Sequence, residues 1–183
     1  YRAELEEYIE KDPLFGTTFN PYHVPYKAPR IVKAMAKAGR QTDVGPMAAV
    51  AGAIAEFVGQ DLLRYSKEII IENGGDIFMR SSRPRRIGVW AGTSPFSQKI
   101  ALEIEPWQTP LGVCTSSGTV GHSVSFGTAD AVVVLSKSTA LADAAATSIG
   151  NAVKGVDYIE VGLDLARKIK GLKGVLIIKE DRM

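Results

Sequence analysis

The chain has 183 residues, of which 45% are hydrophobic and 23% charged, and its formal net charge is +2. This length suits one large domain or two small units that share a core. The small net charge disfavours nucleic acid as a partner. The longest apolar run, residues 44–55, is about a dozen residues long, whereas a membrane span needs roughly 20, so we expect no membrane partner.

Cysteine usage points to a reducing compartment. The single cysteine, Cys114, excludes an intramolecular disulfide and a multi-cysteine zinc site. No signal peptide is visible, and we therefore expect a cytoplasmic protein. The basic run from Arg80 to Arg86 contains Pro84 and two serines, which predicts a solvated turn between strands.

Helices are predicted first along the chain, at residues 2–11, 29–38 and 46–65. Asp12-Pro13 ends the first of them, and Gly39 stops the second. A loop punctuated by prolines, residues 15–29, separates these two. Thr42 or Asp43 is placed to cap the third helix, whose apolar residues follow the helical period.

Strands follow, with two further helices near the end of the chain. The predicted strands are residues 67–72, 77–80, 86–91, 99–105, 111–115, 131–135 and 174–179, and the helices are residues 138–153 and 157–169. Asn73-Gly74 is a strong hairpin signal. Because helices cluster and strands come in hairpins, the pattern predicts an α+β fold with a largely antiparallel sheet.

The most informative stretch is the helix of residues 138–153, which is almost without bulky side chains. Asp143 and Thr147 lie four residues apart, so their oxygens share one helical face among alanines. A carboxylate and a hydroxyl in such a setting can hold a hard cation. The alternative is that Asp143 only favours the helix dipole and Thr147 has no special role.

Two loops can contact a phosphate-bearing ligand. Asn73, Gly74, Gly75 and Asp76 lie between two strands, where glycines let backbone N–H groups approach a ligand; the alternative is an ordinary hairpin turn. A second loop offers hydroxyl donors to phosphate oxygens, or is simply a solvated turn. Its residues are Thr115, Ser116, Ser117, Gly118 and Thr119.

Two side chains beside the hydroxyl loop are candidates for catalysis. His122 is the best-placed general base in the chain, and the alternative, which the sequence favours, is a surface histidine. Cys114 precedes the loop and is either a nucleophile or a buried small thiol.

Taken in order, four motifs resemble those of ApbE-type proteins, the magnesium-dependent transferases that cleave FAD and attach FMN to a threonine. The motifs are Asp-Val-Gly-Pro-Met-Ala at residues 43–48, Asn-Gly-Gly-Asp at 73–76, Cys-Thr-Ser-Ser-Gly at 114–118 and Ala-Asp-Ala-Ala-Ala-Thr at 142–147. The resemblance is to a compact branch of that superfamily. It covers residues 28–153.

The resemblance implies a fold and a ligand set. The fold is a single ApbE-like domain over residues 1–183, of the tunnelling type, in which helix pairs back an antiparallel sheet; upstream strands are expected to be absent from this chain. Asp143, Thr147 and the carbonyl of Ala48 match the metal ligands. The segments 73–76 and 115–118 match the nucleotide site, so Mg²⁺ and FAD or a related nucleotide are the implied cofactors.

The sequence also departs from the transferases. Ala49 stands where they carry a lysine, and their His-x-x-Asp-Pro segment has no counterpart between Thr119 and Ala129. The function expected is therefore binding of a small phosphate-bearing cofactor or nucleotide, flavin-like, through a divalent cation, with hydrolysis or transfer at the phosphate. The alternatives are a non-catalytic binding or assembly module, and an enzyme that uses Cys114 or His122. Exposed sheet edges, and a fold type that often closes its sheets between subunits, predict a homo-oligomer.

Overall fold

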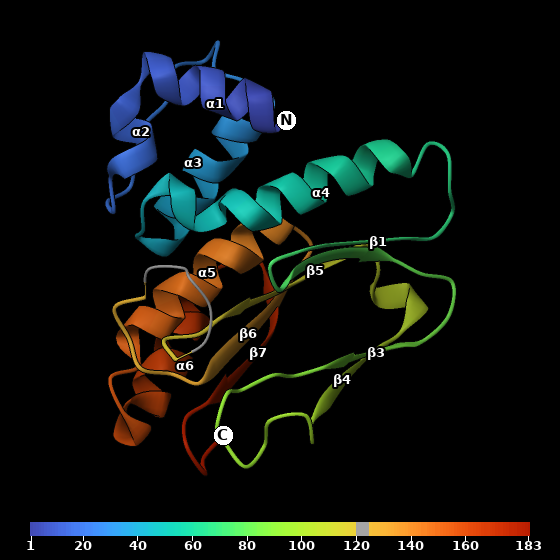
Figure 1. The fold of residues 1–183 in the computed structure, drawn as a ribbon, viewed down its shortest axis with the longest axis vertical. Helices are drawn as coiled ribbons and strands as arrows, with labels where there is room; N and C mark the ends of the chain where they lie inside the picture. Colours follow the sequence, from blue (N-terminus) through green and yellow to red (C-terminus); the bar gives the residue numbers. More distant parts are fainter. Residues whose placement is uncertain (120–124) are drawn as a thin grey trace.

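The computed structural model describes residues 1–119 and 125–183, and its centre is a five-stranded sheet (Figure 1). The strand order is β1-β2-β5-β6-β7, and every neighbouring pair is antiparallel. The strands are β1 Ile69–Asn73, β2 Asp76–Arg80, β5 Leu111–Ser116, β6 Ala131–Ser136 and β7 Leu172–Ile178. A separate antiparallel pair, β3 Arg85–Gly88 and β4 Ala101–Ile104, lies beside this sheet.

Helices cover one face of the sheet in two layers. Helices α4, α5 and α6 lie next to the strands, and α1, α2 and α3 lie beyond them (Figure 1). The α-helices are α1 Arg2–Lys11, α2 Pro13–Thr17, α3 Arg30–Thr42, α4 Val50–Leu62, α5 Thr139–Ala152 and α6 Ile159–Lys168. Three short 3₁₀ turns are η1 Pro46–Ala49, η2 Pro106–Gln108 and η3 Val156–Tyr158. This arrangement confirms the predicted α+β fold.

Helix α5 occupies the middle of the molecule because its side chains are small. It packs against α3, α4, β5 and β6, and most of its residues are buried. Ser138 caps its first turn by accepting a bond from the N–H of Leu141 at 3.3 Å. Glu56 of α4 accepts from the N–H of Ala140 at 3.0 Å. The two helices are therefore joined at the start of α5.

The end of the second predicted helix and both ends of the third differ from the prediction. Helix α3 continues through Gly39 to Thr42, because Gly39 serves a close contact rather than a stop: a Cβ on it would lie 2.7 Å from the carbonyl oxygen of Val44. Asp43 has φ of 56° and ends α3, so neither it nor Thr42 caps the next helix. Residues 46–49 instead form η1, and α4 begins at Val50.

A short helix, α2, also replaces the start of the predicted loop, and Phe15 within it is fully buried. None of the helices in the described part of the chain is both long and apolar enough to cross a membrane.

Candidate functional site

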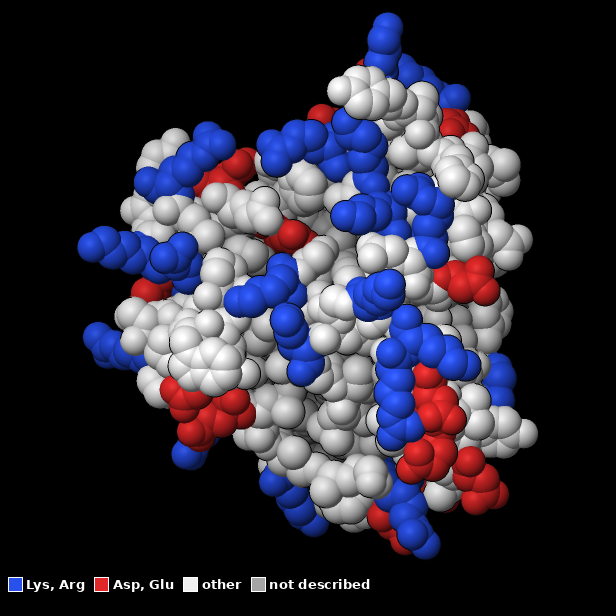
Figure 2. Space-filling model, turned by 180° about the vertical axis from the view of Figure 1, so that it is seen from behind, with Lys and Arg blue, Asp and Glu red and all other residues white. Residues whose placement is uncertain are grey.

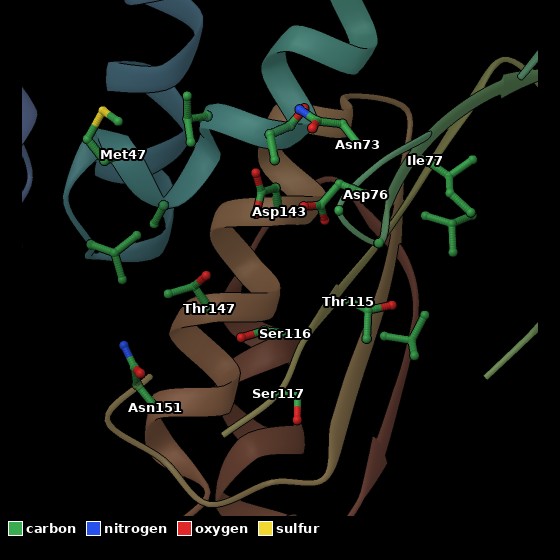
Figure 3. Close-up of a pocket in the computed structure, with 18 of the residues that line it drawn as sticks. Met47, Asn73, Asp76, Ile77, Thr115, Ser116, Ser117, Asp143, Thr147 and Asn151 are labelled. Atoms are coloured by element: carbon green, nitrogen blue, oxygen red, sulfur yellow. The ribbon is translucent and has the colours of Figure 1, made fainter. Parts of the chain in front are cut away.

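A cavity of about 1140 Å³ opens between η1 and α4 on one side and the ends of β2 and β5 on the other. Helix α5 forms its floor, and Figure 3 shows the polar side chains that point toward it. Ten of the predicted site residues line this one cavity: Ala48, Asn73, Gly74, Gly75, Asp76, Thr115, Ser116, Ser117, Asp143 and Thr147. The fold therefore brings together the segments that the motifs singled out.

Asp143 is held in place by backbone donors from another helix. Its Oδ2 accepts from the N–H of Gly52 at 2.8 Å, and the N–H of Ala51 donates to the same carboxylate. Burial raises the pKa of Asp143 well above its usual value, and the nearby charge of Asp76 raises it further, against the lowering effect of the two amides. Thr147 lies one turn further along the same face of α5, as predicted (Figure 3).

Asp76 is the second carboxylate of the cavity and points toward Asp143 (Figure 3). The residue is 6% exposed, and the N–H of Thr115 donates to its carboxylate. Its Oδ1 nevertheless has no hydrogen-bond partner among the described residues. Burial raises the pKa of Asp76 to about 6. Two buried carboxylates thus face each other, one of them with an unsatisfied oxygen.

The turn of residues 73–76 holds Asp76 at the start of β2. Gly74 and Gly75 have φ of 65° and 100°, which other residues rarely adopt. Asn73 donates through Nδ2 to the carbonyl oxygen of Ala51 at 3.2 Å, which ties the turn to α4. The N–H of Gly75 donates to Oε1 of Glu72 at 2.7 Å, so this amide is already engaged. The turn mainly positions Asp76 and leaves open space above the glycines.

The hydroxyl loop contributes only its first part to the cavity. Thr115, Ser116 and Ser117 line the wall. Gly118 is exposed away from it, and its N–H donates to the carbonyl oxygen of Ala129 at 2.9 Å. Thr119 donates through Oγ1 to Asp130 at 3.1 Å. Gly118 and Thr119 therefore close the loop rather than face the cavity.

Of the two residues predicted as candidates for catalysis, the structure describes only Cys114. His122 lies outside the described residues. Cys114 is fully buried, its thiol donates to the carbonyl oxygen of Thr139 at 3.4 Å, and burial raises the pKa of the thiol well above its usual value. A buried, protonated thiol is a poor nucleophile, so Cys114 has a packing role.

Several residues of the cavity were not predicted from the sequence. Gly52 supplies an amide to Asp143, and Asn151 continues the face of Asp143 and Thr147 by one more turn. Phe19, Trp90 and Phe126 also line the cavity. Asn151 repeats the four-residue spacing of the pair and was therefore open to prediction, whereas the others come from segments that only the fold brings close.

A family model described as AbpE bacteria matches residues 1–170. The chain belongs to this family. Among curated relatives of this ApbE-like chain, the UPF0280 protein of Methanocaldococcus jannaschii is 48% identical over 187 residues, covering 100% of the chain and 76% of the relative. A UPF0280 protein of Methanosarcina acetivorans is 44% identical over 181 residues, covering 98% and 71%.

A solved structure gives an independent view of the fold. The apo form of the flavinyl transferase ApbE from Pseudomonas stutzeri is similar with a TM-score of 0.51 and 20% sequence identity. The similarity covers 75% of this chain and 52% of that chain, so it spans about half of the transferase. The likeness shows that the α+β architecture is that of ApbE.

Proposed function

We propose that this ApbE-like chain binds a phosphate-bearing, flavin-like nucleotide through a divalent cation of the magnesium class. Asp143, Thr147 and the carbonyl of Ala48 would hold the cation, with Asp76 beside them. The observation that supports this proposal is the buried carboxylate of Asp76, which points toward Asp143 and whose Oδ1 has no hydrogen-bond partner in the part of the chain that the structure describes. The same site can support hydrolysis or transfer at the bound phosphate.

The residues present fit such a cation. Two carboxylates that share a buried site repel each other, and a buried polar atom without a partner costs free energy. A hard cation with oxygen ligands removes both penalties. In the ranges that the structure covers, no three His, Cys, Asp or Glu side chains group together. Hydroxyl and carbonyl oxygens and the ligand's own phosphate must therefore complete the coordination, as is common for Mg²⁺.

The rest of the cavity fits a phosphate-bearing ligand. Thr115 and Ser116, at the end of β5, both line the cavity and carry hydroxyl groups (Figure 3). Such groups donate to phosphate oxygens. The volume of about 1140 Å³ is slightly above the range of about 300–1,000 Å³ that is usual for small-molecule sites, so a nucleotide fits within it. When bound, the cation neutralises and polarises a phosphoryl group, while the protein orients that group and shields it from bulk water.

Family membership and the structural similarity to the Pseudomonas stutzeri protein, a flavinyl transferase, support a flavin-like ligand. The rival proposal is a binding or assembly module that keeps the fold without the chemistry. It is favoured by Ala49, which replaces the lysine of the transferases and is fully buried away from the cavity wall. Cation binding is expected under the first proposal and is dispensable under the second.

The test is calorimetric titration with Mg²⁺ and with Mn²⁺. We expect Asp143→Ala to abolish binding and Asp76→Asn to weaken it at least about tenfold, because each substitution removes a carboxylate from the site. Asp157→Ala, which removes an exposed carboxylate from η3, should bind like the wild type. Equal binding in the wild type and in Asp143→Ala, or none in either, contradicts the proposal.

A further inference from the structure

Positive charge is concentrated in residues 13–42, far more than the net charge of the chain suggests. The whole chain has 22 Lys and Arg and 20 Asp and Glu, and five of the cations but none of the acids lie in this segment. The segment therefore carries +5 and the remainder −3, which together give the net +2. The five cations are Lys27, Arg30, Lys33, Lys37 and Arg40.

Four of these cations form a stripe along one face of α3. Arg30, Lys33, Lys37 and Arg40 recur at intervals of three and four residues, which places them on the same side of an α-helix. This cationic stripe is about 15 Å long, at 1.5 Å per residue. The other face of α3 is buried in the helical core, so the helix holds the stripe in place. None of the five cations lines the cavity, and their surface is therefore separate from it.

The charges of the stripe are not neutralised by the protein. Among the described residues, none of the five cations forms an ion pair with a carboxylate. Lys27, Arg30, Lys37 and Arg40 are exposed, and Lys33 is half-buried. Like charges at these helical spacings repel one another. A ligand with a row of negative charges would remove this repulsion along the whole stripe.

An exposed aromatic ring lies beside the stripe. Tyr26, in the turn that precedes α3, is 92% exposed. Nζ of Lys33 lies 5.4 Å from the centroid of its ring and donates to its carbonyl oxygen at 3.2 Å. Lys33 thus ties Tyr26 to the cations. Surfaces that bind single-stranded nucleic acid combine these two features, since the cations follow the phosphates and the rings stack on bases.

We propose that the cationic stripe, together with Lys27 and Tyr26, binds single-stranded nucleic acid. The stripe is long enough for about four phosphates at 3.4 Å per nucleotide of a stacked strand. An acidic protein segment would use the cations and leave the ring without a role. An anionic membrane would require a broad apolar face beside the cations, whereas Tyr26 is a single ring. Nucleic acid is the partner that uses both features, and this binding goes beyond the function proposed for the cavity.

The experiment measures binding by fluorescence anisotropy. The probes are labelled oligouridylate and oligothymidylate of about 12 nucleotides, titrated from about 50 to about 200 mM KCl. EDTA is present throughout, so that cation-dependent binding in the cavity makes no contribution. We expect at least one probe to bind, with a slope of about −2 to −3 in a plot of log K against log salt, which corresponds to about three or four phosphates. Comparison of the probes distinguishes RNA from DNA.

Two substitutions separate the phosphate contacts from the stacked base. Lys37→Gln should reduce the magnitude of the salt slope by about 0.7, the value for one phosphate contact on a single strand. Tyr26→Ala should weaken binding about 5- to 100-fold and leave the slope unchanged, because it removes one stacked base. Tyr26→Phe keeps the ring and should bind like the wild type.

Lys99→Gln is the matched control for Lys37→Gln. Lys99 is exposed just before β4, outside the stripe, and its substitution should change neither affinity nor slope. Circular dichroism verifies that each variant is folded, which is expected because Tyr26, Lys37 and Lys99 are all exposed.

Competition experiments test the other classes of partner. Unlabelled oligonucleotide should displace the probe at least about tenfold more effectively than polyglutamate of equal charge, because polyglutamate has no bases to stack. Equal displacement, or binding that depends on Lys37 but not on Tyr26, identifies a general surface for polyanions and overturns the proposal. Failure of both probes to bind also overturns it. So does binding to phosphatidylserine vesicles when neither oligonucleotide binds.

Discussion

At the scale of single residues, Asp76 and Asp143 determine how the site responds to pH. Each carboxylate is deprived of water, and the charge of Asp76 further raises the pKa of Asp143. A bound proton or cation must therefore neutralise part of the negative charge of the two carboxylates. In the absence of cations the proton takes that place at low pH, and it has to leave before a cation can bind.

The stability of the cation-free protein should fall as the pH rises from about 4 to above 6. The pKa of Asp76 is about 6 in the folded chain, whereas a free aspartate has a pKa of about 3.9, so the folded state binds the proton more tightly than the unfolded state. This difference corresponds to about 3 kcal/mol of stabilisation of the folded state, which is present below about pH 4 and lost above about pH 6.

Urea unfolding at several pH values, with a chelator present, measures this effect. The free energy of unfolding of Asp76→Asn should depend less on pH than that of the wild type, and near pH 7.5 the variant should be the more stable protein. Asp143 shifts in the same direction, partly because of the charge of Asp76, so the difference between the two proteins reports Asp76 together with its effect on Asp143. Parallel pH profiles for the two proteins would contradict the assignment.

Ala49 leads to a prediction about flavin transfer. The lysine of the transferases is missing at this position, and the alanine is buried in the helical core. We expect no FMN to be transferred from FAD to a threonine-containing acceptor peptide in the presence of Mg²⁺. Mass spectrometry of the peptide provides the measurement, with an active flavin transferase as positive control. A covalent flavin on the peptide after incubation with this chain would refute the prediction.

Whether two site residues can be predicted to meet depends on how far apart they lie in the sequence. Asp143 and Thr147 are four residues apart on one helix, so their common face follows from helical geometry alone. The meeting of Asp76 with Asp143 does not, because it requires β2 to lie over α5. The engaged amide of Gly75 and the outward position of Gly118 likewise depend on hydrogen bonds that composition does not reveal.

At the scale of elements, the contact between α4 and α5 controls the site. A Cβ on Gly52 would lie 2.6 Å from the carbonyl oxygen of Thr139 and 2.7 Å from Cβ of Asp143. Gly52→Ala should therefore destabilise the fold by about 1–3 kcal/mol and weaken Mg²⁺ binding, because the helices must move apart and carry Asp143 with them. Chemical denaturation and calorimetry measure the two effects.

Gly155→Ala is a matched control for Gly52→Ala. Nothing lies within 4 Å of a Cβ at Gly155, and its φ of 174° is extended backbone. This variant should keep both the stability and the cation affinity of the wild type. If Gly52→Ala behaves like the control, the close contact between the helices is not essential.

The element types were largely predictable from the sequence, and the boundaries were less so. Alternating and β-branched residues identified the strands, and Asn73-Gly74 identified the hairpin between β1 and β2. The helix end predicted at Gly39 was wrong because glycine both ends helices and permits close contacts between segments. Here the carbonyl oxygen of Val44 lies close to Gly39, and only the folded path of the chain reveals that contact. The boundary between η1 and α4 could not be predicted, because the helical spacing of apolar residues continues through both elements.

At the scale of the whole molecule, the outer strands predict assembly. Within residues 1–119 and 125–183, β1 and β7 each have a neighbour on one side only, and Ile70 of β1 is 52% exposed. On the reverse face, Lys and Arg side chains are spread over the middle as well as the periphery, with uncharged residues between them (Figure 2). The unpaired edges favour a second copy as partner.

We expect a homodimer whose interface buries more than about 1,000 Å². Light scattering at micromolar concentration measures the mass, and the monomer value is 19.7 kDa. Ile70→Lys places a charge on the outer strand and should shift the mass toward that of one chain if β1 takes part. A single-chain mass for the wild type would count against the dimer.

The two amides that bind Asp143 have a consequence for the entropy of ligand binding. Gly52 and Ala51 fix the orientation of the carboxylate while the chain folds, before any ligand arrives. The rotational freedom of that side chain is therefore lost once, during folding, and little of it remains to be lost on binding. A site that is ordered in advance in this way binds with a smaller entropic penalty than one built on a free surface side chain.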